Sequence, residues 1–380
     1  MKILIAPDSF KGSLTAVQAT QAMADGIHDA NPAIETVMLP VADGGEGTMS
    51  SLVGATNGTT VTVTVQDPIG RQVNASYGVL GDGETCVIEI AEASGLMLLT
   101  EEERNPLITS TFGTGQLIVH ALDAGLRKFI IGLGGSATND GGSGLLQALG
   151  MKLLDANSKE LTQGGGALGS LYTMEQTSFD ERISESHFLI ACDVENPLTG
   201  SEGASAIFGP QKGAMPKMVN LLDENLGVFA KVVEKLTGIS LHARKGAGAA
   251  GGAGGAFQAF FPGEMKQGIS VVLETILFDQ QLRDADLIVT GEGKTDRQTL
   301  AGKAPFGIAK VAAREGKPII LISGAVDNGS RELLAPLFSE LHAIADGSVS
   351  AEESMENAEH YLRLKTKEVM ENYLTTKKGV

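Results

Sequence analysis

Short apolar runs alternate with amphipathic stretches at both ends of the chain. The runs Lys2–Ala6 and Glu35–Leu39 have the length and composition of buried strands, and the segment between them places apolar side chains at helical spacing. The alternation returns later, where Asp286–Thr290 and Lys317–Ser323 are continuous apolar runs. This pattern is typical of parallel strands connected by helices. The expected helices are Ala16–Asp29, with Ser13 as its N-cap, and Ala304–Glu315. Glu352–Tyr373 is expected to be a charged amphipathic helix on the surface.

The middle of the chain has a different pattern. Residues 59–79 alternate apolar and polar positions around a Pro-Ile-Gly turn, which predicts an antiparallel hairpin. Since 380 residues are too many for one core, we expect a two-domain α/β fold. Residues 1–65 and 285–380 would form one Rossmann-like parallel-sheet domain, interrupted by a larger inserted α/β domain of residues 66–284. A small-molecule site is then expected in a cleft between the domains.

Charge and composition narrow the classes of function. The chain has 46 acidic and 29 basic residues, and its formal net charge of −17 disfavours nucleic acid and anionic membrane surfaces as partners. No apolar run approaches the roughly 18 residues that a membrane span needs. MKILIAPD indicates a first strand rather than a signal peptide, and Cys86 and Cys192 are expected to be free thiols, so we expect a cytoplasmic location. Any phosphate site must be locally positive, built from backbone N–H groups, lysines or a metal ion.

The strand-like run Phe129–Leu133 leads into a glycine-rich loop that precedes a predicted helix. Glycines let a loop turn its N–H groups inward, and a helix N-terminus adds positive partial charge, so this loop could hold phosphate. Asp140 could hold a metal or position a hydroxyl. A plain turn is the alternative, but a plain turn would not need so many polar side chains. The loop residues expected at the site are Gly134, Gly135, Ser136, Ala137, Thr138, Asn139, Gly141 and Gly142.

The same loop matches the dinucleotide-binding pattern GxGxxA at Gly132, Gly134 and Ala137, with Asp155 about 20 residues further on. In a dinucleotide fold the helix has already begun at the third small residue. Here that would place Asp140-Gly141-Gly142 inside its first turns, at a cost of about 1 kcal/mol for each glycine. A nicotinamide-dependent dehydrogenase therefore stays a minor alternative.

Two loops near the N-terminus also combine glycine with charge directly after predicted strands. In DSFKGS (Asp8–Ser13), Lys11 could clamp an oxyanion or a carboxylate, and a solvent-facing lysine is the alternative. In PVADGGEG (Pro40–Gly47), Asp43 could be a metal ligand or a base for the substrate, or an Asp that caps a helix.

Three later segments repeat this combination. Asp193 follows the apolar run at the start of CDVENPLTG, at the strand end where α/β sheets place ligands, and Lys212 in FGPQKGA is a second basic candidate for phosphate. TGEGKTDRQTLAGK supplies Glu292, Asp296 and Lys303 around three glycines. Phosphoryl transfer needs cations on the phosphates, carboxylates for Mg²⁺ and a positioned hydroxyl, so the loops together predict phosphate chemistry on a small acceptor.

The segment Ala247–Ala256 (AGAAGGAGGA) is low in complexity. A flexible linker would carry more serine and fewer apolar neighbours than this segment has. We therefore expect a structured close approach, either between two backbones or to a ligand.

Six segments resemble the motifs of the bacterial glycerate kinase type I family, in the family's order. They are APDSFKGSL, PVADGGEG, GGSATNDGG, CDVENPL, FGPQKGA and GEGKTDRQTLAGKAP. The resemblance spans nearly the whole chain and implies a two-domain α/β enzyme that transfers phosphate from ATP to D-glycerate with Mg²⁺. It implies 2-phosphoglycerate as the product, with 3-phosphoglycerate as the alternative. The protein would be a monomer or a homodimer without nucleic acid or membrane partners.

The expected roles are distributed over these motifs. Glycerate would place its carboxylate near Lys11 or another cation, and Asp193 or Asp43 would accept the proton of the attacking hydroxyl. The candidates for Mg²⁺ are Asp140, Glu292 and Asp296. The other residues expected to bind substrate or nucleotide, besides the glycine-rich loop, are Ser9, Gly44, Gly45, Asn196, Lys212, Gly291 and Lys303.

Overall fold

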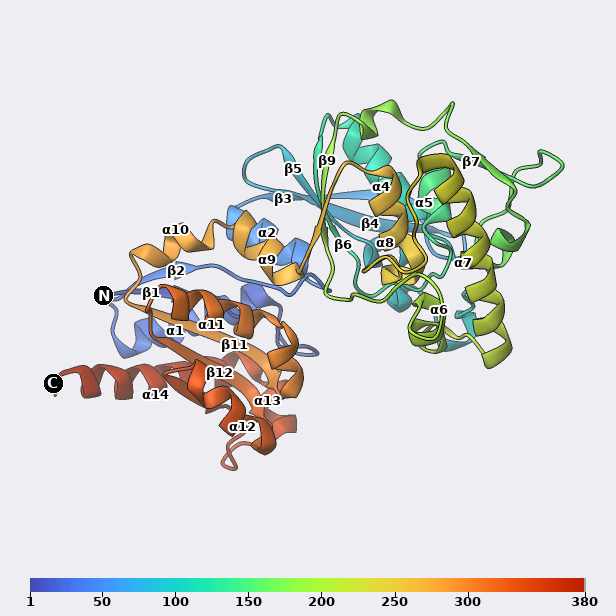
Figure 1. The fold of residues 1–380 in the computed structure, drawn as a ribbon. Coiled ribbons are helices and arrows are strands. Elements are labelled where there is room, and N and C mark those ends of the chain that lie inside the picture. The colour runs from blue at the N-terminus through green and yellow to red at the C-terminus, as the bar shows by residue number, and fades with distance from the viewer. Residues whose placement is uncertain (379–380) are drawn as a thin grey trace. The chain divides into compact units, whose positions relative to one another are not determined.

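The computed structural model describes residues 1–378, which form two compact units (Figure 1). Unit 1 comprises Met1–Asp43, Ser50–Asn57 and the chain from Gln267 onward, and unit 2 comprises Gly44–Met49 and Gly58–Lys266. Both ends of the chain, blue and red in Figure 1, therefore belong to the same unit. Each unit has its own sheet, so each is described by itself.

Unit 1 contains a five-stranded sheet in the order β13-β12-β11-β1-β2, and all its strand pairs are parallel. In β1, Ile3, Leu4 and Ile5 are fully buried, as expected for a parallel strand covered on both faces. The order changes direction between β1 and β11, which makes this a doubly wound sheet with one switch point. The strands are β1 (Lys2–Ile5), β2 (Glu35–Met38), β11 (Leu287–Thr295), β12 (Ile319–Val326) and β13 (Glu340–Ala343).

Helix α1 shows how local sequence sets an element boundary in unit 1. Thr15 is its N-cap: the Thr15 hydroxyl accepts from the Gln18 N–H, and the Gln18 side chain accepts from the Thr15 N–H. The apolar pattern alone suggested Ser13 as the cap, but the Ser13 hydroxyl donates to the Phe10 carbonyl instead. The helices are α1 (Ala16–Ala30), α2 (Thr48–Thr56, beginning in unit 2), α9 (Gly268–Thr275), α10 (Phe278–Arg283), α11 (Ala304–Arg314), α12 (Asn328–Leu334), α13 (Ala351–Glu356) and α14 (Ala358–Lys378).

The predicted surface helix at the end of the chain is two helices, and α14 contributes to the core. Leu362, Val369 and Met370 are buried in the same cluster as Met23 and Ile27 of α1. The two helices approach so closely that a side chain at Gly26 would overlap the Arg363 carbonyl. The segment does form an amphipathic helix as predicted, but α1 covers the apolar face of α14.

Unit 2 contains a six-stranded mixed sheet in the order β10-β9-β6-β5-β4-β3. The predicted hairpin is confirmed, because β3 and β4 pair antiparallel from Thr59↔Val79 to Gln66↔Gln72. The pairs β5–β6, β6–β9 and β9–β10 are parallel. The strands are β3 (Thr59–Gln66), β4 (Gln72–Val79), β5 (Thr85–Glu89), β6 (Lys128–Gly132), β9 (His187–Ala191) and β10 (Gly263–Lys266), with β7 (Lys152–Leu154) and β8 (Thr173–Glu175) as a separate pair.

The units differ from the predicted domain boundaries in three places. Residues 44–49 are predicted in the first domain but belong to unit 2. Residues 58–65 are also predicted in the first domain, but β3 is hydrogen-bonded into the sheet of unit 2. Residues 267–284 were placed in the inserted domain, but α9 and α10 belong to unit 1. The order of the parts along the chain matches the expectation, and their division into domains in the functional sense stays a prediction.

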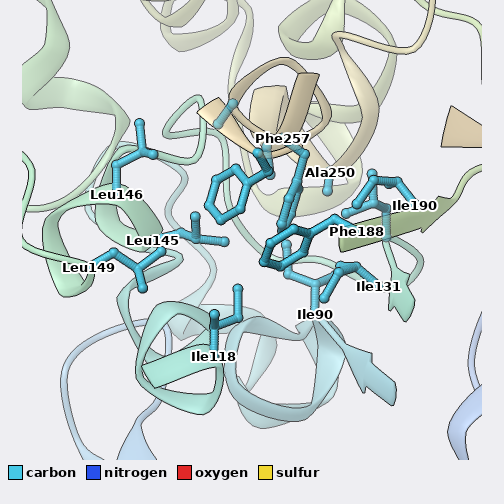
Figure 2. Packing of buried hydrophobic residues seen from close by; sticks show 14 of the residues in the cluster. Ile90, Ile118, Ile131, Leu145, Leu146, Leu149, Phe188, Ile190, Ala250 and Phe257 are labelled. Carbon is cyan, nitrogen blue, oxygen red and sulfur yellow. The ribbon is translucent and has the colours of Figure 1, made fainter. Parts of the chain in front are cut away.

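The core of unit 2 is formed by one face of the sheet and the helices on it (Figure 2). Phe129 and Phe188, on neighbouring strands, stack with ring centroids 4.7 Å apart. Phe188 also contacts Phe257, and Ile118 and Leu145 fill the cluster from α4 and α5. The helices of the unit are α3 (Ala91–Ser94), α4 (Phe112–Asp123), α5 (Ser143–Ala148), α6 (Ala204–Phe208), α7 (Pro216–Thr237) and α8 (Ala253–Phe260).

The low-complexity segment packs backbone against backbone, which confirms the predicted close approach. The Gly141 N–H donates to the Gly251 carbonyl at 2.9 Å, so the segment is bonded to the glycine-rich loop. Gly251 has φ +66°, and a Cβ there would overlap the Thr138 carbonyl oxygen. A Cβ at Gly252 would lie 2.7 Å from the Gly141 Cα. The glycines are therefore required by the lack of space between two chain segments.

Substitution Gly251→Ala should lower the free energy of unfolding of unit 2 by more than about 3 kcal/mol, because it adds a steric overlap to an unfavourable φ. Gly238→Ala is the matched control: Gly238 also has positive φ (+75°), but no atom lies within 4 Å of the added Cβ, so the expected cost is only about 1 kcal/mol. Thermal or urea unfolding of both variants measures the difference. Equal losses would contradict the packing argument.

Candidate active site

Unit 1 has a pocket of about 380 Å³ at the carboxyl ends of its central strands. Asp8 follows β1, Asp43 follows β2, and Glu292 lies in β11, so the pocket opens where the strand order changes direction. That point is where open α/β sheets bind ligands. The polar side chains that line it are Asp8, Ser9, Lys11, Ser13, Asp43, Glu292, Lys294, Lys303 and Ser354.

Asp8 is a buried carboxylate in the same pocket as Asp43. Its N–H donates to the Gly291 carbonyl at 2.8 Å, and the Ser9 N–H donates to its Oδ1 at 2.6 Å. Burial, and next the negative charge of Asp43, raise the pKa of Asp8 to about 7. A carboxyl group held in this way is stabilised by a proton or by a cation beside it.

Glu292 is held by three donors. Its Oε1 accepts from the hydroxyls of Thr295 and Thr299 at 2.9 and 2.7 Å, and its Oε2 accepts from the Lys303 ammonium at 3.3 Å. Burial raises the pKa of Glu292, while Thr299 and Lys303 act in the opposite direction. Lys303 also lies 3.8 Å from Asp296. Glu292 and Asp296 therefore hold Lys303 at the pocket wall.

Unit 2 holds the glycine-rich loop between several segments. The Leu96 N–H donates to the Gly135 carbonyl, the Ala137 N–H donates to the Ser94 carbonyl, and the Thr109 hydroxyl donates to the Ala137 carbonyl. Two of these bonds use carbonyl groups of the loop, and the third uses the Ala137 N–H. Among the residues that the structure describes, no acceptor bonds the N–H groups of Gly134, Gly135, Ser136, Thr138 and Asn139. Successive N–H groups of this kind form a concave site for an anion.

Lys212 supports this loop from inside unit 2. Its side chain is 2% exposed, and its ammonium donates to the Ser136 hydroxyl at 2.8 Å and to the Thr138 carbonyl at 2.7 Å. Burial lowers the pKa of Lys212 to about 7, and the negative charge of Asp140 acts against that shift. Lys212 is thus a buried part of the loop, not an exposed phosphate ligand.

Asp140 shapes the start of helix α5. Its Oδ1 accepts from the Gly142 N–H, and its Oδ2 accepts from the N–H and hydroxyl of Thr111 and from the Gly144 N–H. The group is fully buried, which raises its pKa although these donors act in the opposite direction. With both oxygens occupied by protein donors, this geometry supports a structural role and not the predicted metal role.

The loop that contains Gly44 and Gly45 meets the glycine-rich loop. The Gly45 Cα lies 3.0 Å from where a Cβ at Gly134 would be, so a larger residue at Gly134 would require the Gly45 backbone to shift. Glu89, at the end of β5, accepts from the Met49 N–H at 2.8 Å and holds this loop. Burial raises the pKa of Glu89 to about 7.

The remaining predicted residues to be placed are Asp193, Asn196 and Gly291. Asp193 is exposed directly after β9. The Asn196 side chain donates to the Glu202 carbonyl and so supports its own loop. Gly291 is buried under the pocket in β11, where a side chain would overlap the Ile322 carbonyl.

The structure thus brings Ser9, Lys11, Asp43, Glu292 and Lys303 together in unit 1 and the two glycine loops together in unit 2. Sequence reasoning missed Asp8 and Lys294 in the first group and Glu89 in the second. For Asp8 a signal was present, because it is the first polar residue after β1.

The dinucleotide-binding pattern does not form the corresponding structure. Helix α5 begins at Ser143, after the two glycines, so Ala137 lies in the loop and not in a helix. Asp155 closes a turn after β7, where its Oδ1 accepts from the N–H groups of Asn157 and Lys159. Among residues 1–378, no helix has the length and apolarity that a bilayer span requires.

Comparison with known proteins agrees with this arrangement. The model of the glycerate kinase family matches residues 3–374. The glycerate kinase of Bacillus subtilis strain 168 is 47% identical over 369 residues, which are 97% of each chain. The glycerate 2-kinase of Escherichia coli K12 is 48% identical over 326 residues, 86% of each chain. The crystal structure of a protein named glycerate kinase 2 from Salmonella typhimurium LT2 has a TM-score of 0.90 and 43% identity, and the match covers all of both chains.

Glu89→Gln should remove a pH dependence of stability. Between pH 4.5, the ordinary value, and about 7, the unfolded chain has lost the Glu89 proton while the folded chain keeps it, so the stability of the wild type falls as pH rises. Over this range the wild type should lose on the order of 3 kcal/mol relative to the variant. Melting temperatures at several pH values measure this, with the exposed Glu84→Gln as control. Parallel profiles for wild type and Glu89→Gln would contradict the burial of an un-ionised carboxyl group.

Proposed function

Because this chain belongs to the glycerate kinase family, we propose that it transfers the γ-phosphoryl group of ATP to the C2 hydroxyl of D-glycerate, giving 2-phosphoglycerate. That the protein is a kinase acting on glycerate follows from the family. The choice of C2 is supported by the name of the Escherichia coli relative, glycerate 2-kinase. The same reaction giving 3-phosphoglycerate is the alternative.

One observation carries the mechanism: acidic and basic side chains from distant parts of the chain line one pocket at the switch point of a parallel sheet. Asp8 and Asp43 supply carboxylates, and Lys11 and Lys303 supply ammonium groups. Phosphoryl transfer depends on positioning and on neutralising the charge of the phosphate oxygens, and this combination provides both. Lys303 is oriented for that purpose by Glu292.

The donor set of the pocket fits Mg²⁺. Asp8 and Asp43 repel each other in a buried setting, and a divalent cation would relieve that repulsion. Mg²⁺ is typically held by one or two carboxylates together with substrate phosphates, so no larger acidic cluster is needed, and none is found among residues 1–378. When bound, the ion would neutralise charge on the phosphates. We propose Asp8 and Asp43 as its ligands, since the oxygens of Glu292 are already bonded by Thr295, Thr299 and Lys303.

The glycine-rich loop of unit 2 is proposed as a phosphate cradle. Its support comes from the N–H groups of Gly134, Gly135 and Ser136, which have no acceptor among the described residues, and from the Lys212 ammonium bonded to the same loop. Backbone donors are suited to phosphate because they are fixed before the ligand arrives. Lys11, exposed at the pocket of unit 1, is proposed to hold the carboxylate of glycerate.

The protein should convert D-glycerate and ATP to ADP and 2-phosphoglycerate only when Mg²⁺ is present. A coupled ADP assay gives the rate, and phosphorus NMR of the product separates 2-phosphoglycerate from 3-phosphoglycerate. Chelation of Mg²⁺ should abolish turnover. Absence of ADP release with glycerate would contradict the proposed function, and 3-phosphoglycerate as the product would contradict only the choice of hydroxyl.

Asp193→Asn tests the proposed base. If Asp193 accepts the proton of the attacking hydroxyl, kcat should fall by about 10²- to 10⁴-fold while the KM values change less. Glu195→Gln is the matched control, since Glu195 is exposed two residues away in the same loop and pairs only with the exposed Lys245. A near-normal kcat for Asp193→Asn would contradict its role as the base, and Asp43 would then be the remaining candidate.

A further inference from the structure

The Arg104 guanidinium group has no partner among residues 1–378. Arg104 follows the helical turn Glu101–Glu103 and is half-buried. Its Nε is buried and bonds no acceptor, and no hydrogen bond or ion pair among the described residues involves the rest of the group. The two other half-buried arginines differ: Arg127 donates to two carbonyls, and Arg182 pairs with two carboxylates.

An unpartnered guanidinium is unfavourable in this chain unless something else binds it. Burying a charged donor without an acceptor costs the free energy of its lost hydration. Acidic residues outnumber basic ones by 46 to 29, so protein carboxylates are plentiful, yet none among the described residues forms an ion pair with Arg104. The arrangement is the one expected for a cation that meets its anion when a ligand binds.

The position of Arg104 connects it to the glycine-rich loop. Arg104 packs against Gly213. A Cβ added at Gly213 would overlap the Arg104 backbone carbonyl and would lie 3.0 Å from the Arg104 Cβ. Gly213 is the neighbour of Lys212, whose ammonium bonds Ser136 and Thr138. Five residues after Arg104, the Thr109 hydroxyl bonds the Ala137 carbonyl. The segment with Arg104 therefore packs along the loop whose N–H groups have no acceptor.

We propose that Arg104 is a substrate-binding residue that holds a pair of anionic oxygens beside the Gly134–Ser136 N–H groups. A guanidinium presents two parallel donors that match a carboxylate or a phosphate, which an ammonium cannot do. The two sources of such oxygens in this reaction are the carboxylate of the three-carbon acid and the phosphates of the nucleotide. This inference rests on the proposed function and adds a residue to it that none of the sequence motifs contains.

The test compares Arg104→Gln and Arg104→Lys with the wild type by steady-state kinetics. Arg104→Gln should raise one KM by about 10- to 100-fold, with a smaller change in kcat, because a charge-assisted pair of hydrogen bonds is lost. Arg104→Lys keeps the charge but loses the paired donors, so it should recover only part of the affinity. The exposed Arg283, which has no side-chain partner among the described residues, gives the control Arg283→Gln, with unchanged constants. Melting temperatures establish that each variant is folded.

The pattern of the losses identifies the bound group. A raised KM for D-glycerate, together with an equal rate of wild type and Arg104→Gln on glycerol, which lacks the carboxylate, assigns Arg104 to the acid. A raised KM for ATP with that for glycerate unchanged assigns it to the phosphates. Either result supports the proposal, whereas unchanged KM values in a folded Arg104→Gln overturn it. A wild type inactive on glycerate would instead overturn the proposed function, and calorimetric titration of ADP and glycerate would still show whether Arg104 binds either one.

Discussion

Direct packing of backbone on backbone in unit 2 is the constraint on which the candidate phosphate site depends. The glycine-rich loop lies against Gly251 and Gly252 on one side and against Gly45 on another, at distances that exclude a Cβ. The bonds that hold it use mainly its carbonyl groups, through Leu96, Thr109 and Lys212. A loop built in this way is rigid without side chains of its own over the N–H groups, so those groups remain available to an anion.

Buried charged groups are the second feature on which the candidate sites depend. In unit 1 the like charges of Asp8 and Asp43 are held close together, and in unit 2 a buried lysine and a buried aspartate lie under the same loop. Each arrangement is unfavourable by itself, since burial disfavours the ionised form. A bound cation would relieve the first, and a bound anion would be attracted by the second. One place that favours a cation and another that favours an anion suit two substrates that carry phosphates and a carboxylate and bind together with a divalent ion.

Much of the fold could be predicted because its strands are continuous apolar runs and its loops contain glycine beside charge. The strands around Ile3 and Val289, the hairpin at Thr59–Val79 and the close approach at Gly251 all follow from such local patterns. The N-cap was misplaced by two residues, since Ser13 and Thr15 both suit a cap and only the geometry of the turn separates them.

The site could be predicted only in part, because burial and pairing depend on residues far apart in the chain. From the sequence, Asp140 is a plausible metal ligand. In the structure its carboxylate accepts hydrogen bonds from Thr111 and from the first N–H groups of α5. Lys212 is predicted as a basic residue for phosphate, and its burial inside the unit could not be seen in the sequence. Glu89 and Arg104 lie in unremarkable sequence, and their roles follow from what does or does not surround them in space. No local spacing encodes that information.

The interrupted course of unit 1 has a consequence for how the protein is made. Its central pair of strands joins Ile3 to Leu287, so β1 leaves the ribosome long before its partner exists. Unit 2 ends at Lys266 and has all its strands by then. During translation the inserted unit can therefore fold first, while β1, with apolar groups on both faces, waits for β11. The apolar side chains of β1 therefore lack their β11 partner until most of the chain has been made.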